Sequence, residues 1–304
     1  MRATASPDTL IRLMPAVFVL IWATGFIVAR YGMPHAPPFG FLVLRFSLSV
    51  ACFVLWVWLA RVRWPQTPAQ WSHLAVTGIL LHAVYLGGVW SAVKSGMGAG
   101  LTALIAGLQP VLTAVWLAAT GIGGQRVSQR QWLGLMLGLV GLLLVVWRKL
   151  THGSPGDHVT LLNLGWAVLG LLAITAGTLY QKRFVKPCDV RSAGAVQLTA
   201  AALVLLPLAA LEAESIQWNG QVVGAMAWSV LGLTLGGSSL LYLLIQRGAA
   251  ASVASLMYLV PPTTAVIAWL LFAEPITALT LAGMALTAVG VALVVRAPAP
   301  STSR

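Results

Sequence analysis

Long apolar stretches recur along the chain, and short polar or charged connections separate them. A helix that crosses a membrane needs about 20 mostly apolar residues, because each residue adds about 1.5 Å and the hydrocarbon layer is about 30 Å thick. Ten segments reach this length or come close to it. The predicted spans are residues 12–31, 39–60, 72–93, 98–120, 131–147, 162–182, 192–211, 222–244, 250–273 and 277–295.

The composition places these segments in lipid rather than in a soluble core. Hydrophobic residues make up 59% of the chain and charged residues only 8%, whereas a soluble domain carries about 25% charged residues. So few charges could not cover a surface that faces water, so lipid must cover much of it. We therefore expect an all-α transmembrane bundle. The two cysteines, Cys52 and Cys188, form neither a disulfide framework nor a metal-binding spacing.

The positive charges predict the orientation of the chain in the membrane. With the N-terminus in the cytoplasm, thirteen Lys and Arg residues fall on the cytoplasmic side and four on the other, with Arg45 left inside a span. Lys and Arg are enriched in cytoplasmic loops. An even number of spans returns both termini to the same side, so both termini are expected in the cytoplasm. The net charge of +12 is explained by this topology, and nucleic-acid binding is not expected, since the basic residues form no dense run.

The two halves of the chain resemble each other. Landmarks coincide when the sequence is shifted by 152 residues, and by 149 residues near the end of each half. The pairs 152 residues apart are Gly25 and Gly177, Arg30 and Lys182, Arg45 and Gln197, Trp90 and Tyr242, Gly96 and Gly248, and Pro110 and Pro262. The pairs 149 residues apart are Gly134 and Gly283, and Gly141 and Gly290.

This repetition predicts the domain organisation. Each half holds five spans, and because five is odd the second half must enter the membrane from the opposite side. Such inverted repeats recur in secondary transporters. We expect a first repeat at 12–147, a connecting loop at 148–161, a second repeat at 162–296 and a disordered tail at 297–304. Chance alignment of Gly-rich apolar helices is the alternative explanation.

Short motifs in a fixed order resemble the drug/metabolite transporter superfamily, specifically its ten-helix EamA-type members. They are IWATGFIVAR at 21–30, LRFSL at 44–48, GLQPVLTAV at 107–115, VPPTTAV at 260–266 and FAEPIT at 272–277. The resemblance covers residues 12–296. It implies a bundle with a central cavity that opens to each side in turn, lined by spans one, three, four, six, eight and nine. It also implies small metabolites as cargo, often moved outward.

One position departs from the family pattern. The fourth span of each half usually ends in Glu-Arg or Glu-Pro, and the second half keeps Glu274-Pro275. The first half has Gln125 where the carboxylate would stand. A mechanism that needs a symmetric pair of acids is therefore weakened.

The sequence lacks the motifs of an enzyme or an ATP-driven pump. There is no Walker A pattern, no HExxH and no GxSxG. The chain has six acidic residues and none lies deep in a span. We expect no catalytic residue, no metal site and no cofactor.

Two ionisable residues inside predicted spans are candidates for function. His82 lies near the middle of the third span, and a titratable ring in hydrocarbon usually faces a cavity or a partner. It could relay protons or contact substrate, or simply hydrogen-bond a neighbouring helix. Arg45 lies about two turns inside the second span. A structural role that lets it reach toward the interface is favoured, and a carbonyl cluster or an anionic ligand is the alternative.

Proline interrupts the fourth and ninth spans at Pro110 and Pro262. A proline inside a helix frees a backbone carbonyl, and broken helices in transporters often expose polar backbone to the substrate. Gln109 stands next to the first of them and offers an amide. A simple kink that shapes the bundle is the alternative.

Aromatic and hydroxyl side chains complete the predicted binding site. An aromatic wall suits an amphipathic ligand, although Trp and Tyr also anchor helices at the membrane interface. Ser and Thr bond neighbouring backbone as readily as substrate. The full predicted substrate-binding set is Trp22, Thr24, His82, Tyr85, Gln109, Tyr180, Ser238, Tyr242 and Tyr258.

The sequence therefore predicts a secondary transporter of a small metabolite, an amino acid or similar compound, working as an exporter by alternating access. A channel and, with less support, an intramembrane lipid enzyme are the alternatives. The expected partners are a small-molecule substrate and the lipid bilayer. Small-residue motifs such as Gly134-x3-Gly138 predict close helix contacts and leave a homodimer open. Short loops favour a bacterial inner membrane.

Overall fold

The first half of the chain folds into helices that follow the predicted spans. The computed structural model describes residues 7–120, 129–151, 158–240 and 257–295, and all regular structure in these ranges is helical. The helices of the first half are α1 (Pro7–Gly32), α2 (Pro38–Leu59), α3 (Pro68–Gly78), the π-helix η1 (Ile79–Val84), α4 (Tyr85–Lys94), α5 (Ala99–Ala106), α6 (Gln109–Ala119) and α7 (Gln129–Thr151).

The second half repeats this plan. Its helices are α8 (Leu161–Phe184), α9 (Val190–Ala210), α10 (Gly220–Ala227), the π-helix η2 (Trp228–Gly237), the 3-10 turn η3 (Met257–Leu259), α13 (Val260–Phe272) and α14 (Ala278–Val295). Residues 241–256 of the eighth and ninth predicted spans lie outside the described residues, as do 152–157 of the connecting loop and the tail at 297–304.

The predicted fold class is confirmed. Eight helical segments of the described residues are long and apolar enough to cross a membrane, and two shorter apolar helices, Val260–Phe272 and Ala278–Leu293, follow them. Many large apolar side chains on these helices are exposed, such as Trp58, Leu161 and Leu270. Exposed apolar surface of this extent is what a lipid environment requires. The protein is an integral, multi-pass membrane protein of two five-span repeats.

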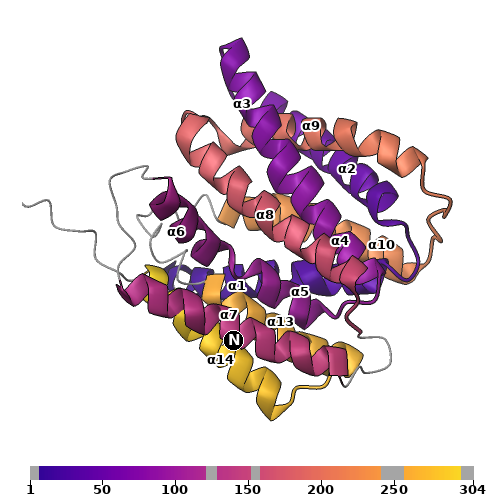
Figure 1. Cartoon of the computed structure of the whole chain (residues 1–304). Helices are drawn as coiled ribbons and strands as arrows, with labels where there is room; N and C mark the ends of the chain where they lie inside the picture. Colours follow the sequence, from indigo (N-terminus) through magenta and orange to yellow (C-terminus); the bar gives the residue numbers. More distant parts are fainter. Residues whose placement is uncertain (1–6, 121–128, 152–157, 241–256, 296–304) are drawn as a thin grey trace, which may run out of the picture.

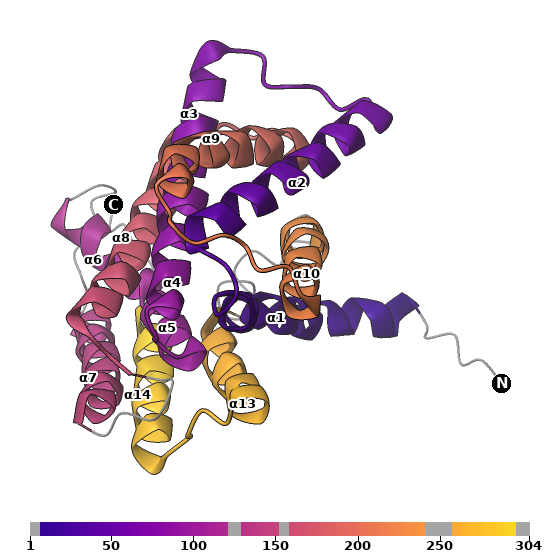
Figure 2. The same ribbon diagram turned by 90° about the vertical axis from the view of Figure 1, so that its right-hand side faces the viewer.

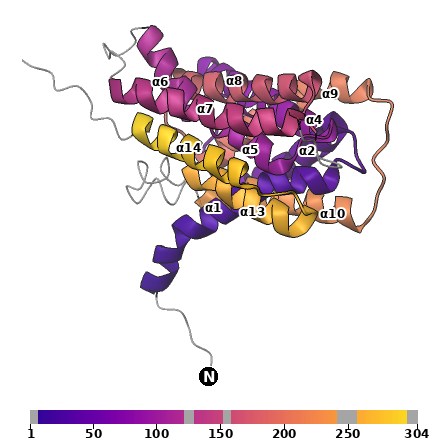
Figure 3. The ribbon, with the colours of Figure 1, turned by 60° about the horizontal axis from the view of Figure 1, so that its bottom comes forward.

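The main helix pairs each join one helix of the first half to one helix of the second half. α2 packs along α9 at one end of the bundle and α7 packs along α14 at the opposite end (Figures 1 and 2). On one flank η1 contacts α8, and on the other η2 contacts α1. These two flanking contacts are equivalent when each half is laid on the other. The N-terminal end of α1 projects away from the bundle (Figure 3).

The contact between α7 and α14 shows the two-fold relation of the halves directly. A Cβ on Gly283 would lie 2.5 Å from the carbonyl oxygen of Gly141, and a Cβ on Gly290 would collide with Gly134. Exchanging each glycine for its repeat counterpart turns one contact into the other. Between them, the Thr287 hydroxyl lies 3.4 Å from the carbonyl oxygen of Gly138, and these two residues are themselves 149 positions apart. The helices are therefore antiparallel, with the two-fold passing through this point.

Both halves carry a π-helical stretch at the same place in their third span. The range 79–84 in the first half corresponds, 152 residues later, to 231–236 inside η2. A π-helix widens the turn and is frequent at functional sites. His82 lies in the first stretch and Thr234 in the second, so the repeat places two polar side chains at equivalent positions within the irregular turns.

The fourth span is interrupted where proline was predicted to act. α5 ends at Ala106 and α6 begins at Gln109, with Leu108 accepting hydrogen bonds from the N–H groups of Val111 and Leu112. Pro110 therefore lies in the first turn of the new helix, where a missing N–H has no cost. Pro262 lies in the equivalent first turn of α13. The two prolines start helices rather than kink continuous ones.

The two halves are tied together on one side of the bundle, which we call the Lys94 face: the connections at 33–37, 95–98, 211–219 and 273–277. Lys94 forms an ion pair with Glu214. Glu212 accepts hydrogen bonds from the N–H groups that begin α2, and Glu274 from those that begin α5. Carboxylates are favourable at helix N-termini because the first N–H groups lack partners there. Each of these three acids belongs to the second half and binds the first.

Candidate functional site

A polar group lies where α2, η1, α9 and η2 meet inside the bundle. The guanidinium Nη2 of Arg45 donates a hydrogen bond of 3.2 Å to the Thr234 hydroxyl. The imidazole of His82 lies beside the side chain of Gln197. Both contacts join the two halves of the chain. We call these four residues the central quartet.

The central quartet obeys the repeat. Arg45 and Gln197 are 152 positions apart, and so are His82 and Thr234. Each contact therefore joins a residue in the second span of one half to a residue in the π-stretch of the other half. One contact becomes the other when the halves are exchanged. The glycine contacts between α7 and α14 are related by the same exchange.

Aromatic rings enclose the charged end of the quartet. Arg45 is only 7% exposed, and its guanidinium carbon lies 5.9 Å from the centre of the Trp90 ring. Tyr85 lies near Arg45. The ring of Phe46 lies 6.1 Å from that of His82. Side chains with a π-face can stabilise a cation that has lost its water.

Glycines let the helices approach closely around the quartet. A Cβ on Gly177 in α8 would lie 2.6 Å from the Leu81 side chain, and a Cβ on Gly25 in α1 would lie 3.7 Å from the Leu233 side chain. Leu81 and Leu233 are again repeat counterparts, next to His82 and Thr234. The 152-residue spacing of Gly25 and Gly177 therefore has a structural cause. Gly177 packs on the π-stretch of the third span, and Gly25 packs on the π-stretch of the eighth span.

Two predicted site residues, His82 and Tyr85, lie in or beside the quartet. A third, Gln109, lies at the break between α5 and α6, where its amide donates a hydrogen bond of 2.9 Å to the Thr178 hydroxyl of α8. Trp22 packs near Gly237, since a Cβ on Gly237 would lie 3.9 Å from the Trp22 ring, and Ser238 is the next residue along the chain. All of these side chains are partly exposed within the bundle.

Thr24 lies on a different surface. Its hydroxyl accepts a hydrogen bond of 2.8 Å from the indole N–H of Trp228. The two residues line a groove of about 310 Å³ between α1 and α10, together with Tyr31. Because Trp228 is 43% exposed, this groove opens on the flank of the bundle and not toward Arg45.

Tyr180 also lies away from the quartet. Its hydroxyl is 2.8 Å from His73 Nδ1, and the centre of its ring lies 4.7 Å from the centre of the Phe184 ring. His73 belongs to α3 and Phe184 ends α8, so this aromatic group lies at the end of the bundle opposite the Lys94 face. Tyr242 lies outside the described residues, and the same holds for the side chain of Tyr258.

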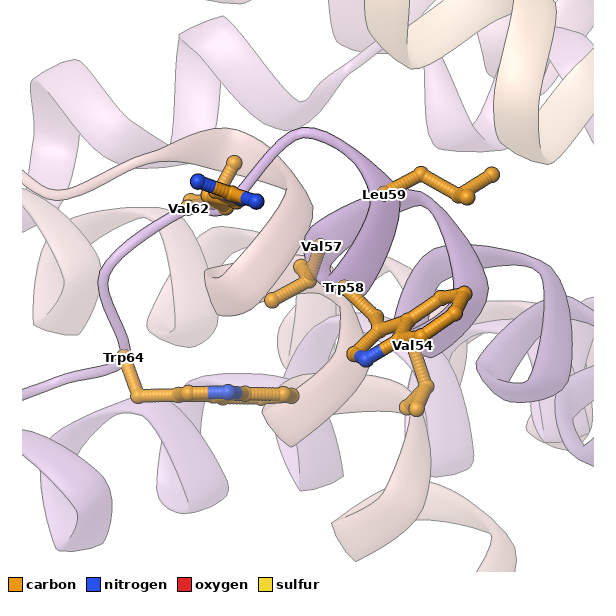
Figure 4. A pocket seen from close by; sticks show the side chains of 7 residues that line it. Val54, Val57, Trp58, Leu59, Val62 and Trp64 are labelled. Atoms are coloured by element: carbon orange, nitrogen blue, oxygen red, sulfur yellow. The ribbon is translucent and has the colours of Figure 1, made fainter.

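A large groove lies at the end of α2 and the loop that follows it (Figure 4). Its volume is about 620 Å³ and its lining includes Trp58, Arg61 and Trp64. Trp58 is 72% exposed. Tryptophan and arginine at the end of a span are typical of the membrane interface, so this groove is distinct from the polar interior.

No group of three or more His, Cys, Asp and Glu side chains that could hold a metal ion occurs among the residues that the structure describes. The chemistry available at the centre is that of a cation, an imidazole, an amide, hydroxyls and aromatic faces. Such a set can bind a polar solute. It offers neither a carboxylate base nor an evident nucleophile.

Known proteins match this chain over most of its length. The model of the EamA-like transporter family matches residues 11–147 and, a second time, residues 161–296. The chain belongs to the EamA-like transporter family. The predicted place in the drug/metabolite transporter superfamily is thereby confirmed.

Several relatives of this EamA-family chain are named as transporters. The uncharacterized transporter YvbV of Bacillus subtilis (strain 168) is 25% identical over 293 residues, which cover 95% of this chain and 92% of YvbV. The uncharacterized inner membrane transporter YedA of Escherichia coli (strain K12) is 25% identical over 226 residues, 74% of this chain and 70% of YedA. A probable amino-acid metabolite efflux pump of Salmonella typhimurium (strain LT2) is 24% identical, with 90% of each chain covered.

A solved crystal structure shares the fold. It superposes with a TM-score of 0.63 at 20% sequence identity, over 93% of this chain and 96% of that chain. The fold of the EamA-family chain therefore agrees with an independent structure. The fold alone does not specify the cargo, which depends on residues such as the central quartet.

The sequence analysis left three members of the quartet out of the predicted substrate-binding set. A structural role was favoured for Arg45, with an anionic ligand as an alternative; Gln197 appeared only as its repeat counterpart, and Thr234 was not singled out. The signal that could have found them was the alignment itself. Two counterparts that are both polar, inside spans that are otherwise apolar, are costly in lipid and so are expected to meet other polar groups.

Proposed function

We propose that this membrane protein is a secondary transporter that exports a small metabolite, an amino acid or a similar compound, by alternating access. The observation that carries the proposal is the pair of equivalent polar contacts in the central quartet, Arg45 with Thr234 and His82 with Gln197. They join the two repeats near the middle of the bundle, where carriers of this plan hold their substrate. An inverted pair of halves can exchange shapes, so that one site opens to each side in turn.

The printed names of relatives support the cargo and the direction. The Salmonella relative is named an amino-acid metabolite efflux pump. Family membership supports transport in general, and this name makes amino acids or their metabolites the first solutes to test. The names of these relatives are those of transporters, which favours transport over catalysis.

The proposed location is the inner membrane of a bacterium, with both termini in the cytoplasm. The thirteen-to-four distribution of Lys and Arg supports this orientation, and YedA is named an inner membrane transporter. In this orientation the Lys94 face lies outside the cytoplasm. The bonds from Glu212, Glu214 and Glu274 then hold the halves together on the outer side, so the described conformation is closed outward.

Counterflow in proteoliposomes tests the proposal. Purified protein is reconstituted, the vesicles are loaded with one unlabelled amino acid at a time, and uptake of the same labelled amino acid is followed. A carrier gives saturable uptake that depends on the internal solute, whereas a channel gives uptake that does not accelerate with internal solute. Protein-free vesicles are the control. If no amino acid in the panel shows exchange above that control, the proposed cargo is wrong.

A further inference from the structure

The charge of Arg45 is buried without a carboxylate partner. Its side chain is more than nine-tenths buried, and its protein contacts are a hydroxyl, the face of Trp90 and the neighbouring Tyr85. Its Nε has no hydrogen-bond partner among the described residues. Burying an uncompensated charge inside a protein costs roughly several kcal/mol of folding free energy. Buried charges are therefore usually paired.

The four acidic residues whose partners the structure gives are engaged elsewhere. Asp189 pairs with Arg191, Glu214 with Lys94, Glu212 with the start of α2 and Glu274 with the start of α5. Asp8 and Asp157 lie outside the predicted spans by sequence. The chain thus places a cation at its centre and supplies the counter-charge from none of the four acids whose positions the structure gives.

Further unused hydrogen-bonding groups lie on the same two elements. In the described part of the chain, three buried side-chain polar atoms have no partner: Arg45 Nε, Ser49 Oγ and Ser229 Oγ. Arg45 and Ser49 are four residues apart and so share a face of α2. Ser229 belongs to η2, which packs against α2 and holds Thr234. Buried polar groups are normally satisfied, so a cluster of exceptions indicates a binding role.

We infer that Arg45 binds the carboxylate of the transported molecule, so that the cargo is a small carboxylate-bearing solute and not a compound that lacks a carboxylate. This inference rests on the proposed transport function and deepens it. The guanidinium matches a carboxylate in shape and can donate two parallel hydrogen bonds. Thr234 and the Trp90 face hold the guanidinium in place while its Nε edge is free to donate.

The repeat provides a sharp variant. Gln197 occupies the position equivalent to Arg45, so the exchange Arg45→Gln with Gln197→Arg moves the charge to the other half and keeps the same set of side chains. Arg45→Lys keeps the charge and removes the planar fork. Arg61→Gln is the matched control, because it removes an arginine just beyond the far end of the same helix.

The test compares paired solutes in the counterflow assay with the full-length protein. The pairs are each amino acid that the wild type exchanges and its amide, which has the same side chain and ammonium group but no carboxylate. We expect the wild type to prefer the amino acid by at least 10-fold, and Arg45→Gln to lose at least 10-fold of the amino-acid rate. Arg45→Lys should keep part of the rate, the exchanged double variant should recover part of it, and Arg61→Gln should stay within about 2-fold.

A binding measurement keeps the test independent of the variants' ability to fold. The same amino acid and its amide are added to the purified wild type in detergent, and the shift in melting temperature is compared with that given by sodium chloride. A shift for the amino acid alone supports the inference. An equal shift with the amide or with chloride overturns it, and so does equal exchange of amides by the wild type. Absence of any exchange by the wild type would instead overturn the proposed function itself, and this inference with it.

Discussion

The two halves of the chain share a scaffold but differ in the chemistry that they bring to the centre. Each half supplies a π-stretch, a helix of the fourth span with a proline in its first turn, and a glycine-lined fifth span. In the central quartet, however, the first half supplies Arg45 and His82, and the second half supplies Gln197 and Thr234. The ionisable groups thus all come from one half. The scaffold has the symmetry that alternating access needs, and the site has the asymmetry that recognition of a small, unsymmetrical solute needs.

The largest effect is expected from breaking the scaffold's symmetry at the contact of α7 and α14. Gly283→Ala would place a methyl group against the backbone of Gly141. Overpacking of this kind costs about 1–3 kcal/mol or more, because the helices must separate. We expect a clear fall in melting temperature and in the yield of folded protein. Gly165→Ala is the control, since no atom lies within 4 Å of its new Cβ. An equal loss in both variants would contradict the account.

Making the two halves more alike at the centre tests whether His82 acts by titration. His82→Thr copies the residue of the second half. It removes the polar contact with Gln197, which costs about 1 kcal/mol, so transport should fall about 5-fold. The dependence of the rate on pH should keep its shape, because the equivalent position in the other half works with a hydroxyl. Initial rates between pH 5.5 and 8 check this, with His73→Gln as the comparison. A pH dependence that disappears only in His82→Thr would establish a proton relay instead.

A smaller effect is expected at Glu274, which has Gln125 as its counterpart in the first half. Gln125 lies outside the described residues. Glu274 is 8% exposed and accepts hydrogen bonds from the first N–H groups of α5. Glu274→Gln keeps the shape but removes the charge that favours a helix N-terminus, a loss of about 0.5–2 kcal/mol. The melting temperature should fall by a few degrees. Glu214→Gln, at an exposed ion pair, should change it less.

The smallest effect is expected at Asp189. Its hydrogen bond with the Arg191 side chain lowers the pKa of the Asp189 carboxyl below its ordinary value of 3.8. A lowered pKa in the folded state stabilises the protein above the ordinary pKa, and this stabilisation is lost as the pH falls through the folded value. Asp189→Asn should therefore melt slightly lower than the wild type at pH 7. The difference should shrink below about pH 4, and a difference that grows there would be the opposite of what the ion pair predicts.

Much of the fold was accessible to sequence reasoning because it depends on length and repetition. An apolar stretch such as 39–60 can do little in lipid except form a helix. The repeat offset of 152 residues paired Arg45 with Gln197, and the glycine spacing indicated close helix contacts, which the structure shows between the fifth and tenth spans. These features are local, or are repeated in the sequence, so no tertiary information was needed to find them.

The site was harder to predict because it depends on how each helix is turned about its axis. Thr24 and Trp22 are two residues apart in α1, yet Thr24 faces the groove with Trp228 while Trp22 lies by Gly237. Apolar residues on both the lipid side and the inner side hide this rotation from a sequence pattern. The π-stretches change the rotation of the helix further. Only the structure identified Thr234 as the hydrogen-bond partner of Arg45.

The central claim is that a polar site between the halves opens to each side of the membrane in turn. Gln109→Cys, in a chain whose Cys52 and Cys188 are replaced by alanine, places a thiol at the break of the fourth span. Its reaction with a membrane-impermeant maleimide is measured from each side of sealed vesicles, with and without an exchanged amino acid. The account predicts labelling from both sides, with the ratio changed by the amino acid. Labelling from one side only, whatever solute is present, would contradict it.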